Sequence, residues 1–419
     1  MFTRIKKIYY EFPRLFWVIV GVRFVDGIGG TLLFPFFALY ITQKFNVGMT
    51  QAGILLGISS LFGLVGSMFG GALTDKFGRK QLILFGLVFS AISTLGFGLV
   101  NDLNILYPLV IVVGLLSSVS HPAHEAMIAD ILPEKKRQEG FGILRVVANF
   151  SWIIGPTIGG FLANINFFYL FVIDAIISCI VAVIIYRTVP ETKPEPHAHE
   201  KSESFLHTVA GYRFVLRDTA FVSFIIANII MLIVYQQMYG SLSVYLRDNH
   251  GINPQGYGFL MSTSAITVIF FQFWLTRTIK HKPPFLMMAF GTIFYVIGFT
   301  LFGLVTTFIL FALNIIIVTI GEMMVVPTSQ ALVAGFAPEE MRGRYMAVSG
   351  LSWAIPSTIG PAAAGYILDN YNPNLLWYIG GVLCGLSVLA YYFLHLRLGH
   401  RQEFAPVEEE ALPLAAPTD

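Results

Sequence analysis

Six charged side chains lie inside apolar segments of this 419-residue chain, and they are the residues best suited to do chemistry. They are four acids and two bases: Asp26, Glu125, Asp174, Glu322, Arg23 and Arg145. A charge in apolar surroundings is costly to bury, so such residues are usually paired or functional. A carboxyl group that loses water in an empty cavity tends to hold a proton, which a cationic ligand or entering water displaces. These acids could therefore exchange a proton for a ligand.

Two of the acids, Asp26 and Glu322, lie deep within their segments. Asp26 follows Arg14 by about twelve residues, or roughly 18 Å along a helix. Arg23 precedes Asp26 by one helical turn, so the two side chains share a face and could pair or exchange partners. We expect Asp26 and Glu322 to take part in proton coupling or ligand binding, against the alternative of a silent buried pair.

Glu125 and Arg145 flank the loop around residue 135 at equal distances along the chain. If the segments before and after this loop are antiparallel helices, both side chains lie at the same depth, which predicts an ion pair. The pair could be structural or could take part in coupling. His121, one turn from Glu125, could extend it as a titrating group. For Asp174 we expect a hydrogen bond that packs helices together.

The composition identifies the elements that must position these residues. Hydrophobic residues make up 56% of the chain and charged residues 12%, and the mean hydropathy is +0.72. These values indicate an integral membrane protein, and the absence of regularly alternating segments argues against a barrel. A net charge of +2 offers no large basic surface for nucleic acid. The two cysteines lie in apolar runs, so we expect no metal site and no cofactor.

Spans of about 20 mostly apolar residues are needed to cross a hydrocarbon core of roughly 30 Å. The sequence predicts twelve, near residues 14–42, 50–73, 81–100, 104–130, 139–163, 166–188, 219–246, 254–277, 284–304, 307–335, 343–369 and 374–397. Basic loops alternate with nearly uncharged ones. By the positive-inside rule the basic loops are cytoplasmic. We therefore expect a multi-pass protein of the plasma (inner) membrane with both termini in the cytoplasm.

An internal repeat defines the expected domains. Shifting the chain by 205 residues aligns Pro122 with Pro327, and the sequence Ile-Gly-Pro at 154–156 with the same sequence at 359–361. We expect six-helix bundles over 1–188 and 219–398, a cytoplasmic linker over 189–218 with an amphipathic helix at 205–216, and a disordered tail over 399–419. Two parallel repeats of this kind share a seam at the midplane that can open to either side. The expected fold is all-α, and the expected state is a monomer.

The loop after the second span reads GALTDKFGRK over residues 71–80. This string resembles the G-x-L-x-D-[RK]-x-G-R-[RK] signature of the major facilitator superfamily and matches it at every specified position. The resemblance implies a gating charge cluster of Asp75, Arg79 and Asp130, with Gly71 and Gly78 allowing close approach at the helix end. The alternative is a purely topological anchor of basic residues, which leaves both acids unexplained.

The fifth span contains GPTIGG at residues 155–160. It resembles the G-P-x-x-G-G motif carried there by the drug/proton antiporters of that superfamily. Pro156 removes a backbone donor, while Gly155, Gly159 and Gly160 allow backbone-to-backbone packing that limits leakage. Val110 stands where many antiporters carry an arginine in the fourth helix, so the usual proton-relay arginine is missing.

The resemblance implies a secondary active transporter working by alternating access, with protons, a small-molecule substrate and the lipid bilayer as partners. We expect proton-coupled efflux of hydrophobic or cationic compounds, as in multidrug antiporters. The alternative is a proton-coupled symporter that imports a small metabolite. An enzyme is disfavoured because the sequence has no nucleotide loop, metal-binding motif or nucleophile elbow, and a channel does not need two rocking halves.

Overall fold

The computed structural model describes residues 9–193, 213–338, 341–401 and 404. Its helices are α2 (Arg14–Leu33), η1 (Phe34–Phe36), α3 (Phe37–Lys44), α4 (Met49–Phe77), α5 (Arg79–Leu99), α6 (Leu103–Ser118), α7 (His121–Ile131), α8 (Glu134–Ile165), α9 (Phe168–Thr188), α11 (Thr219–Tyr235), α12 (Gln237–Gly240), α13 (Leu242–His250), α14 (Pro254–Ile279), α15 (Pro284–Phe302), α16 (Phe308–Phe336), α17 (Arg342–Asn370) and α18 (Asn374–Leu398). The described residues form no strands, so the expected all-α fold is confirmed.

Eleven of the described helical segments are long and apolar enough to cross a membrane. Several spans join two helices, such as α6 with α7 around the break at Val119 and Ser120. The helix α17 has 29 residues but is less apolar and contains Pro356 and Pro361. With α17 the segments match the twelve predicted spans. Most of the predicted amphipathic helix at 205–216 and most of the tail lie outside the described residues, while residues 213–217 are helical.

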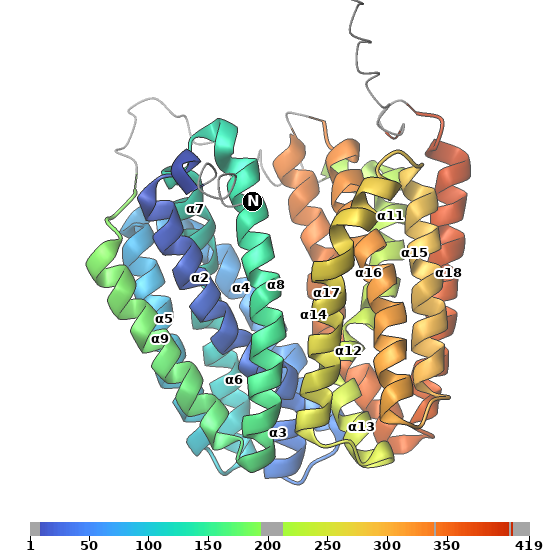
Figure 1. Ribbon diagram of the computed structural model, residues 1–419, viewed down its shortest axis with the longest axis horizontal. Coiled ribbons are helices and arrows are strands. Elements are labelled where there is room, and N and C mark those ends of the chain that lie inside the picture. The colour runs from blue at the N-terminus through green and yellow to red at the C-terminus, as the bar shows by residue number, and fades with distance from the viewer. Residues whose placement is uncertain (1–8, 194–212, 339–340, 402–403, 405–419) are drawn as a thin grey trace, which may run out of the picture.

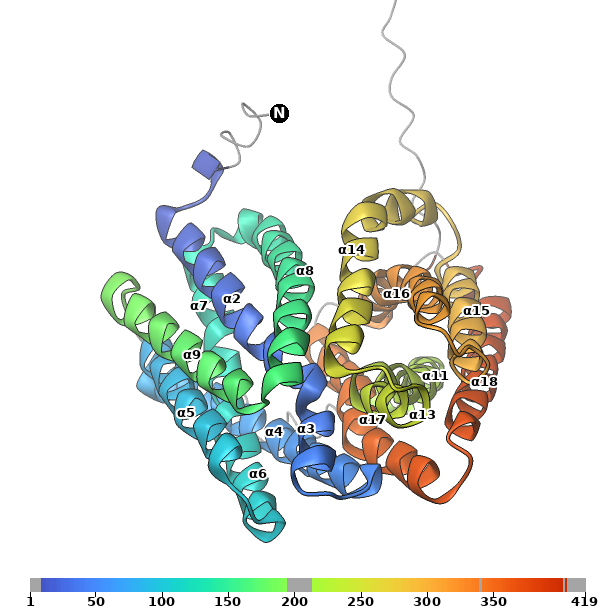
Figure 2. The ribbon, with the colours of Figure 1, turned by 60° about the horizontal axis from the view of Figure 1, so that its bottom comes forward.

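The helices form two bundles side by side, α2–α9 and α11–α18 (Figures 1 and 2). A pair of hydrogen bonds confirms that the bundles are structural repeats. The Tyr40 hydroxyl donates to the Phe97 carbonyl in the first bundle, and the Tyr245 hydroxyl donates to the Phe302 carbonyl in the second, at 3.1 Å. Both partners are shifted by the same 205 residues, so the sequence repeat is a repeat of structure.

The two bundles meet closely at one end through glycines, which we call the glycine seam. Gly53 of α4 lies against the Pro361 carbonyl of α17, and its repeat counterpart Gly258 of α14 lies against the Pro156 carbonyl of α8. A Cβ atom at either glycine would collide with the facing backbone. These contacts lie at the helix ends opposite the basic loops, so the bundles are closed at that end. We call the other end the basic end.

A carboxylate reinforces the closed end. Asp369 of α17 accepts hydrogen bonds from the backbone N–H groups of Met49 and Thr50 at the start of α4, both at 2.8 Å, and from the Thr50 hydroxyl at 2.6 Å. The acid caps a helix of the other bundle, where exposed N–H groups and the helix dipole favour negative charge. Toward the basic end, by contrast, Gly343 and Gly350 of α17 face open space.

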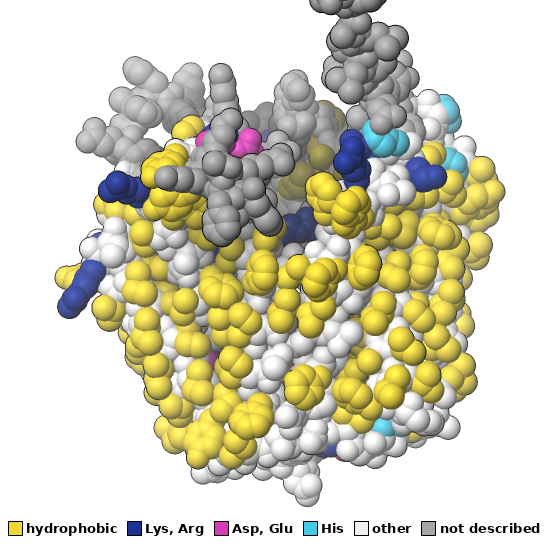
Figure 3. Space-filling model, viewed as in Figure 1, with side chains coloured by type: hydrophobic (Ala, Val, Ile, Leu, Met, Phe, Trp, Pro, Cys, Tyr) yellow, Lys and Arg dark blue, Asp and Glu magenta, His cyan; other side chains and the backbone are white. Residues whose placement is uncertain are grey.

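The outer surface is apolar around the bundles. Hydrophobic side chains cover the flank in Figure 3, and the visible Lys and Arg side chains gather mainly near the upper, basic end. Large aromatic residues on α14 illustrate this, since Phe270, Phe273 and Trp274 are 67%, 66% and 68% exposed. Such a surface matches a bilayer better than water.

Candidate functional site

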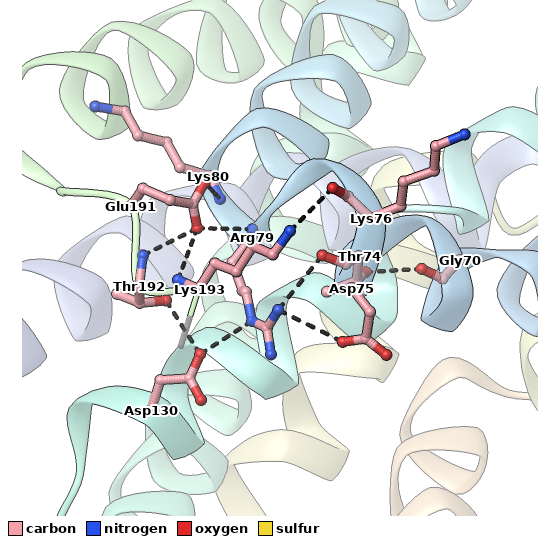
Figure 4. Close-up of polar contacts among 10 residues, drawn as sticks. All are labelled: Gly70, Thr74, Asp75, Lys76, Arg79, Lys80, Asp130, Glu191, Thr192 and Lys193. Carbon is pink, nitrogen blue, oxygen red and sulfur yellow. Dashed lines mark hydrogen bonds and ion pairs between the residues drawn. The ribbon is translucent and has the colours of Figure 1, made fainter. Parts of the chain in front are cut away.

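The predicted charge cluster forms where α4 ends and α5 begins (Figure 4). Arg79 Nε lies 3.0 Å from Asp130 Oδ2 of α7, and Arg79 Nη1 lies 3.4 Å from Asp75 Oδ1. The Arg79 side chain is 11% exposed, whereas that of Asp75 is 77% exposed. The Arg79–Asp130 pair is therefore the shielded contact, and Asp75 contributes a weaker, solvent-exposed one. The structure brings together the three residues expected from the loop signature.

Glu191 belongs to this cluster and was not predicted. It follows α9, and its carboxylate accepts hydrogen bonds from the backbone N–H groups of Arg79, at 2.8 Å, and Lys80, at 3.1 Å. It thereby caps the start of α5. Partial burial raises the pKa of the Glu191 carboxyl, but four backbone N–H donors outweigh it and lower the pKa overall. The sequence signal was an acid directly after the sixth span, beside the basic loop.

The two glycines of the loop signature have different surroundings. Gly78 adopts a φ of +96°, and a Cβ atom there would approach Glu191 Oε2 at 2.5 Å. Only glycine suits both conditions. Gly71, in contrast, has no neighbouring atom within 4 Å of a Cβ position, so the structure shows no close approach there.

The GPTIGG segment packs α8 against both bundles. Gly155 lies against Thr31 of α2, and Gly159 lies against the Leu32 carbonyl of the same helix. Gly160 faces the other bundle, where a Cβ atom would come within 2.7 Å of the Pro254 carbonyl of α14. The backbone-to-backbone packing expected from this motif is present, and it forms half of the glycine seam.

A cavity of about 550 Å³ lies between the bundles, lined mainly by the first. Two carboxyl groups face it, Asp26 of α2 and Asp174 of α9, and they interact electrostatically. The Thr94 hydroxyl donates to Asp174 Oδ2 at 3.0 Å, which confirms the expected packing hydrogen bond. Hydroxyl groups line much of the rest: Ser59, Ser60, Ser90, Ser93, Thr94, Ser117, Ser178, Tyr239 and Ser357. The position of Asp174 in the same cavity as Asp26 was not predicted.

The predicted ion pair between Glu125 and Arg145 is wrong. Arg23 Nη2 lies 3.6 Å from Glu125 Oε1, while Arg145 donates to Gln330 Oε1 of α16 at 3.1 Å. Two residues at equal depth in the membrane can point in different directions, because the direction of a side chain depends on its position around the helix. Glu125 faces α2, whereas Arg145 faces the second bundle across the seam.

Arg23 is thus paired with Glu125, and its expected contact with Asp26 is reduced to an electrostatic influence at longer range. His121, on α7 one turn before Glu125, is also under the influence of Arg23. It makes no hydrogen bond to Glu125 among the described contacts, so the predicted extension of the pair is absent there.

Glu322 lies in a second cavity of about 350 Å³ at the interface between the two bundles. The two cavities are neighbours, because Phe34, Gln236 and Tyr239 line both. Asp26 lines the first cavity and Glu322 lines the second.

Comparison with known proteins identifies the fold and its general activity. A family model described as "Major Facilitator Superfamily" matches residues 19–357 and 236–417. The chain is 29% identical over 359 residues to a Na(+), Li(+), K(+)/H(+) antiporter of Planococcus maritimus, covering 79% of this chain and 84% of the relative. It is 22% identical over 394 residues to the quinolone resistance protein NorA of Staphylococcus aureus (strain COL), covering 92% and 96%.

Solved structures agree with the sequence relatives. A POT family transporter in complex with 5-aminolevulinic acid superimposes with a TM-score of 0.79 at 16% identity, covering 92% of this chain and 96% of that one. The relatives are transporters, so the chain is a membrane transporter and not an enzyme. By sequence and by fold, it belongs to the major facilitator superfamily.

Proposed function

We propose that this transporter exports hydrophobic or cationic small molecules in exchange for protons by alternating access. The observation that carries the proposal is the placement of Asp26 and Asp174 in a cavity between the two bundles. A carboxyl group that faces such a cavity can be protonated when the cavity is empty and lose its proton when a cation enters. Two electrostatically coupled acids strengthen this competition between proton and cation.

The closed end of the two bundles indicates from which side of the membrane the ligand and the protons would enter and leave. The basic end is cytoplasmic by the positive-inside rule, so the bundles are closed on the outer side by the glycine seam and Asp369. A ligand would enter from the cytoplasm and displace protons from the acids. Rocking of the bundles would then open the outer side, where protons would replace the ligand. The charge cluster around Arg79 would stabilise one of the two conformations, closed or open on the outer side, and its contacts would break in the other.

A second candidate is exchange of a monovalent metal cation for protons. The cavity around Asp26 presents carboxyl and hydroxyl oxygens, the ligand type that hard cations prefer. The antiporter of Planococcus maritimus is named for such an exchange. Import of a polar metabolite with protons is less well supported, because two polar residues of the second bundle, Asn228 and Asn314, are buried and hydrogen-bonded within that bundle.

Transport in sealed vesicles with an imposed pH gradient tests the proposal. The account expects efflux of an organic cation that stops when the gradient is collapsed. Asp26→Asn keeps the side-chain size but cannot exchange a proton, so it should abolish gradient-driven efflux while the protein still folds. A full rate of coupled efflux in Asp26→Asn would reject Asp26 as the coupling residue. Counterflow of Na⁺ or K⁺ under the same gradient separates the second candidate from the first.

A further inference from the structure

A groove of about 700 Å³ opens on the outer surface of the second bundle, and it shares no lining residue with the two cavities between the bundles. Its walls come from α14, α15, α16 and α18, and in Figures 1 and 2 α16 lies between α14 and α15. Phe290, Ile293 and Leu389 line the groove and are exposed, so it faces the bilayer. The polar side chains in its lining are those of Thr278, Lys282 and Tyr392.

The groove marks a departure of the second bundle from the repeat. In the first bundle, a Cβ atom at Gly70 of α4 would collide with the Val119 carbonyl at the end of α6, so the two backbones are in contact there. The repeat positions are Leu275 of α14 and Met324 of α16. Both line the groove. A leucine side chain does not permit the close approach that a glycine allows, so α14 and α16 stand apart and leave the groove open.

The mouth of the groove at the basic end carries positive charge. Lys282 lines it in the connection between α14 and α15, and Arg277 and Lys280 are exposed nearby in the chain. None of the three makes an ion pair with a described residue, and residues 249–321 include no Asp or Glu. Lys280 stands at the repeat position of Asp75, so a base replaces the acid of the first bundle's charge cluster.

A phospholipid with an anionic headgroup matches both parts of this surface. An acyl chain suits apolar walls, because a gap would leave their atoms without contacts, and a phosphate suits an unpaired lysine. By the positive-inside rule the mouth lies at the cytoplasmic leaflet, where anionic lipids attract basic residues. We propose that the groove binds one anionic phospholipid, with an acyl chain between α14 and α15 and the headgroup at Lys282.

The bound lipid would replace a contact that the second bundle lacks. In the first bundle, Arg79 joins the start of α5 to α7 through Asp130. At the repeat positions the second bundle has Pro284 and Gly335, which cannot form such a pair. A lipid that contacts α14, α15 and α16 together would hold the cytoplasmic ends of these helices in place.

Native mass spectrometry of the purified full-length protein tests the assignment. The protein in detergent micelles receives equal amounts of dioleoyl phosphatidylglycerol, which is anionic, and dioleoyl phosphatidylcholine, which has the same chains and no net charge. We expect one phosphatidylglycerol to stay bound, with a preference of about tenfold over phosphatidylcholine, because several basic groups attract it. Glycerol 1-phosphate, which carries the phosphate without acyl chains, should not displace the lipid.

Two variants separate the headgroup from the acyl chain, each with a matched control in the first bundle. Lys282→Gln should lower the preference for phosphatidylglycerol about fivefold. Arg187→Gln, which removes an exposed cation in the last turn of α9, should leave it unchanged. Ile293→Trp places a larger side chain in the groove and should lower the retention of both lipids. Val88→Trp, at the exposed repeat position on α5, should not.

Three results would overturn the proposal: equal retention of the two lipids by the unaltered protein, an unchanged preference in Lys282→Gln, or unchanged retention in Ile293→Trp. Selective retention that appears only after removal of residues 405–419 would also overturn it, because the acidic residues at 408–410 would then be the partner of these cations in the full chain. The comparison of the two lipids uses the unaltered protein, so it decides the question even if a variant does not fold. Lipid binding needs no pH gradient and no transported ligand, so its outcome is independent of the proposed export function.

Discussion

The two bundles share a backbone design but differ in their charges. At the closed end, Gly53 packs on Pro361 and Gly258 packs on Pro156, which are equivalent contacts under the repeat. The acids do not follow the repeat. Asp26 corresponds to Met231, a residue 1% exposed in the second bundle, and Glu322 corresponds to Ser117, which lines the first cavity. The repeat therefore accounts for how the bundles close, and the departures from it account for where chemistry can occur.

The difference extends to the basic end. The first bundle holds Arg79 between Asp130 and Asp75, with Glu191 capping α5. The corresponding loop of the second bundle, residues 276–282, has neither the glycines nor the acid of the signature. One bundle thus carries this charge cluster, and the corresponding loop of the other bundle lacks the residues to form it.

The largest effect should come from filling the glycine seam. In Gly53→Val or Gly258→Val, the added side chain meets backbone atoms of the facing helix that cannot move aside. If the two contacts are equivalent, both variants should lower transport about tenfold or more, by similar factors. Gly385→Val, at a helical position with open space, is the control. A large loss of transport in only one of the two variants, Gly53→Val or Gly258→Val, would contradict the equivalence of the two contacts.

A smaller loss should follow from removing the central charge of the cluster. Arg79→Gln leaves Asp130 without its shielded partner, which should cost about 1–3 kcal/mol in the state that the pair stabilises. We expect transport to fall about tenfold, measured as initial efflux rate. Arg277→Gln, in the equivalent loop of the second bundle, should change the rate less than about twofold because surface charges contribute little. Equal losses in both variants would contradict a cluster confined to one half.

The cap across the closed end should contribute less than the cluster. Asp369→Asn removes a charge that accepts three hydrogen bonds from the start of α4. We expect destabilisation of the closed end by about 1 kcal/mol, seen as faster labelling of a cysteine placed at the buried position 52 of α4 by a membrane-impermeant thiol reagent. Asn164→Ala, at the repeat position, should have a smaller effect because α14 is capped by its own Asn253 at 2.9 Å. Faster labelling in Asn164→Ala than in Asp369→Asn would refute this asymmetry.

The smallest effect concerns Glu191 and depends on pH. Its folded-state pKa is below the ordinary value of 4.5, so its stabilisation is present at neutral pH and is lost as the pH falls through the folded-state value. At pH 7, Glu191→Gln should reduce stability by about 1 kcal/mol, as expected for loss of a helix cap. Thermal unfolding in detergent should show that the difference from the unaltered protein narrows in acid. A difference that grows in acid would have the wrong sign.

Much of the fold could be predicted from the sequence because a membrane span imposes a length and a composition that few other segments meet. The helix α17 shows the limit, since it is less apolar than the eleven other segments and contains two prolines, although the predicted spans included it at residues 343–369. The cluster of Asp75, Arg79 and Asp130 was predictable because a contiguous loop motif carries two of its three members.

The rest of the site depended on the direction of side chains around each helix, which depth along the chain does not determine. Arg145 faces Gln330 instead of Glu125, and Asp174 turns toward Asp26 from a helix far along the sequence. The placement of Asp26 and Glu322 in neighbouring cavities has the same origin. Phe34 and Tyr239 come from opposite bundles, and their packing against each other lets both rings line both cavities.

The most direct test of rocking halves driven by a buried acid is a distance measurement at both ends of the seam. Spin labels at the exposed positions 51 and 371 would report the closed end, and labels at positions 142 and 343 would report the basic end. Protonation should lengthen one distance and shorten the other, and Asp26→Asn should fix both near their protonated values at every pH. The account is contradicted if both distances change in the same direction, or if Asp26→Asn still responds to pH as the unaltered protein does.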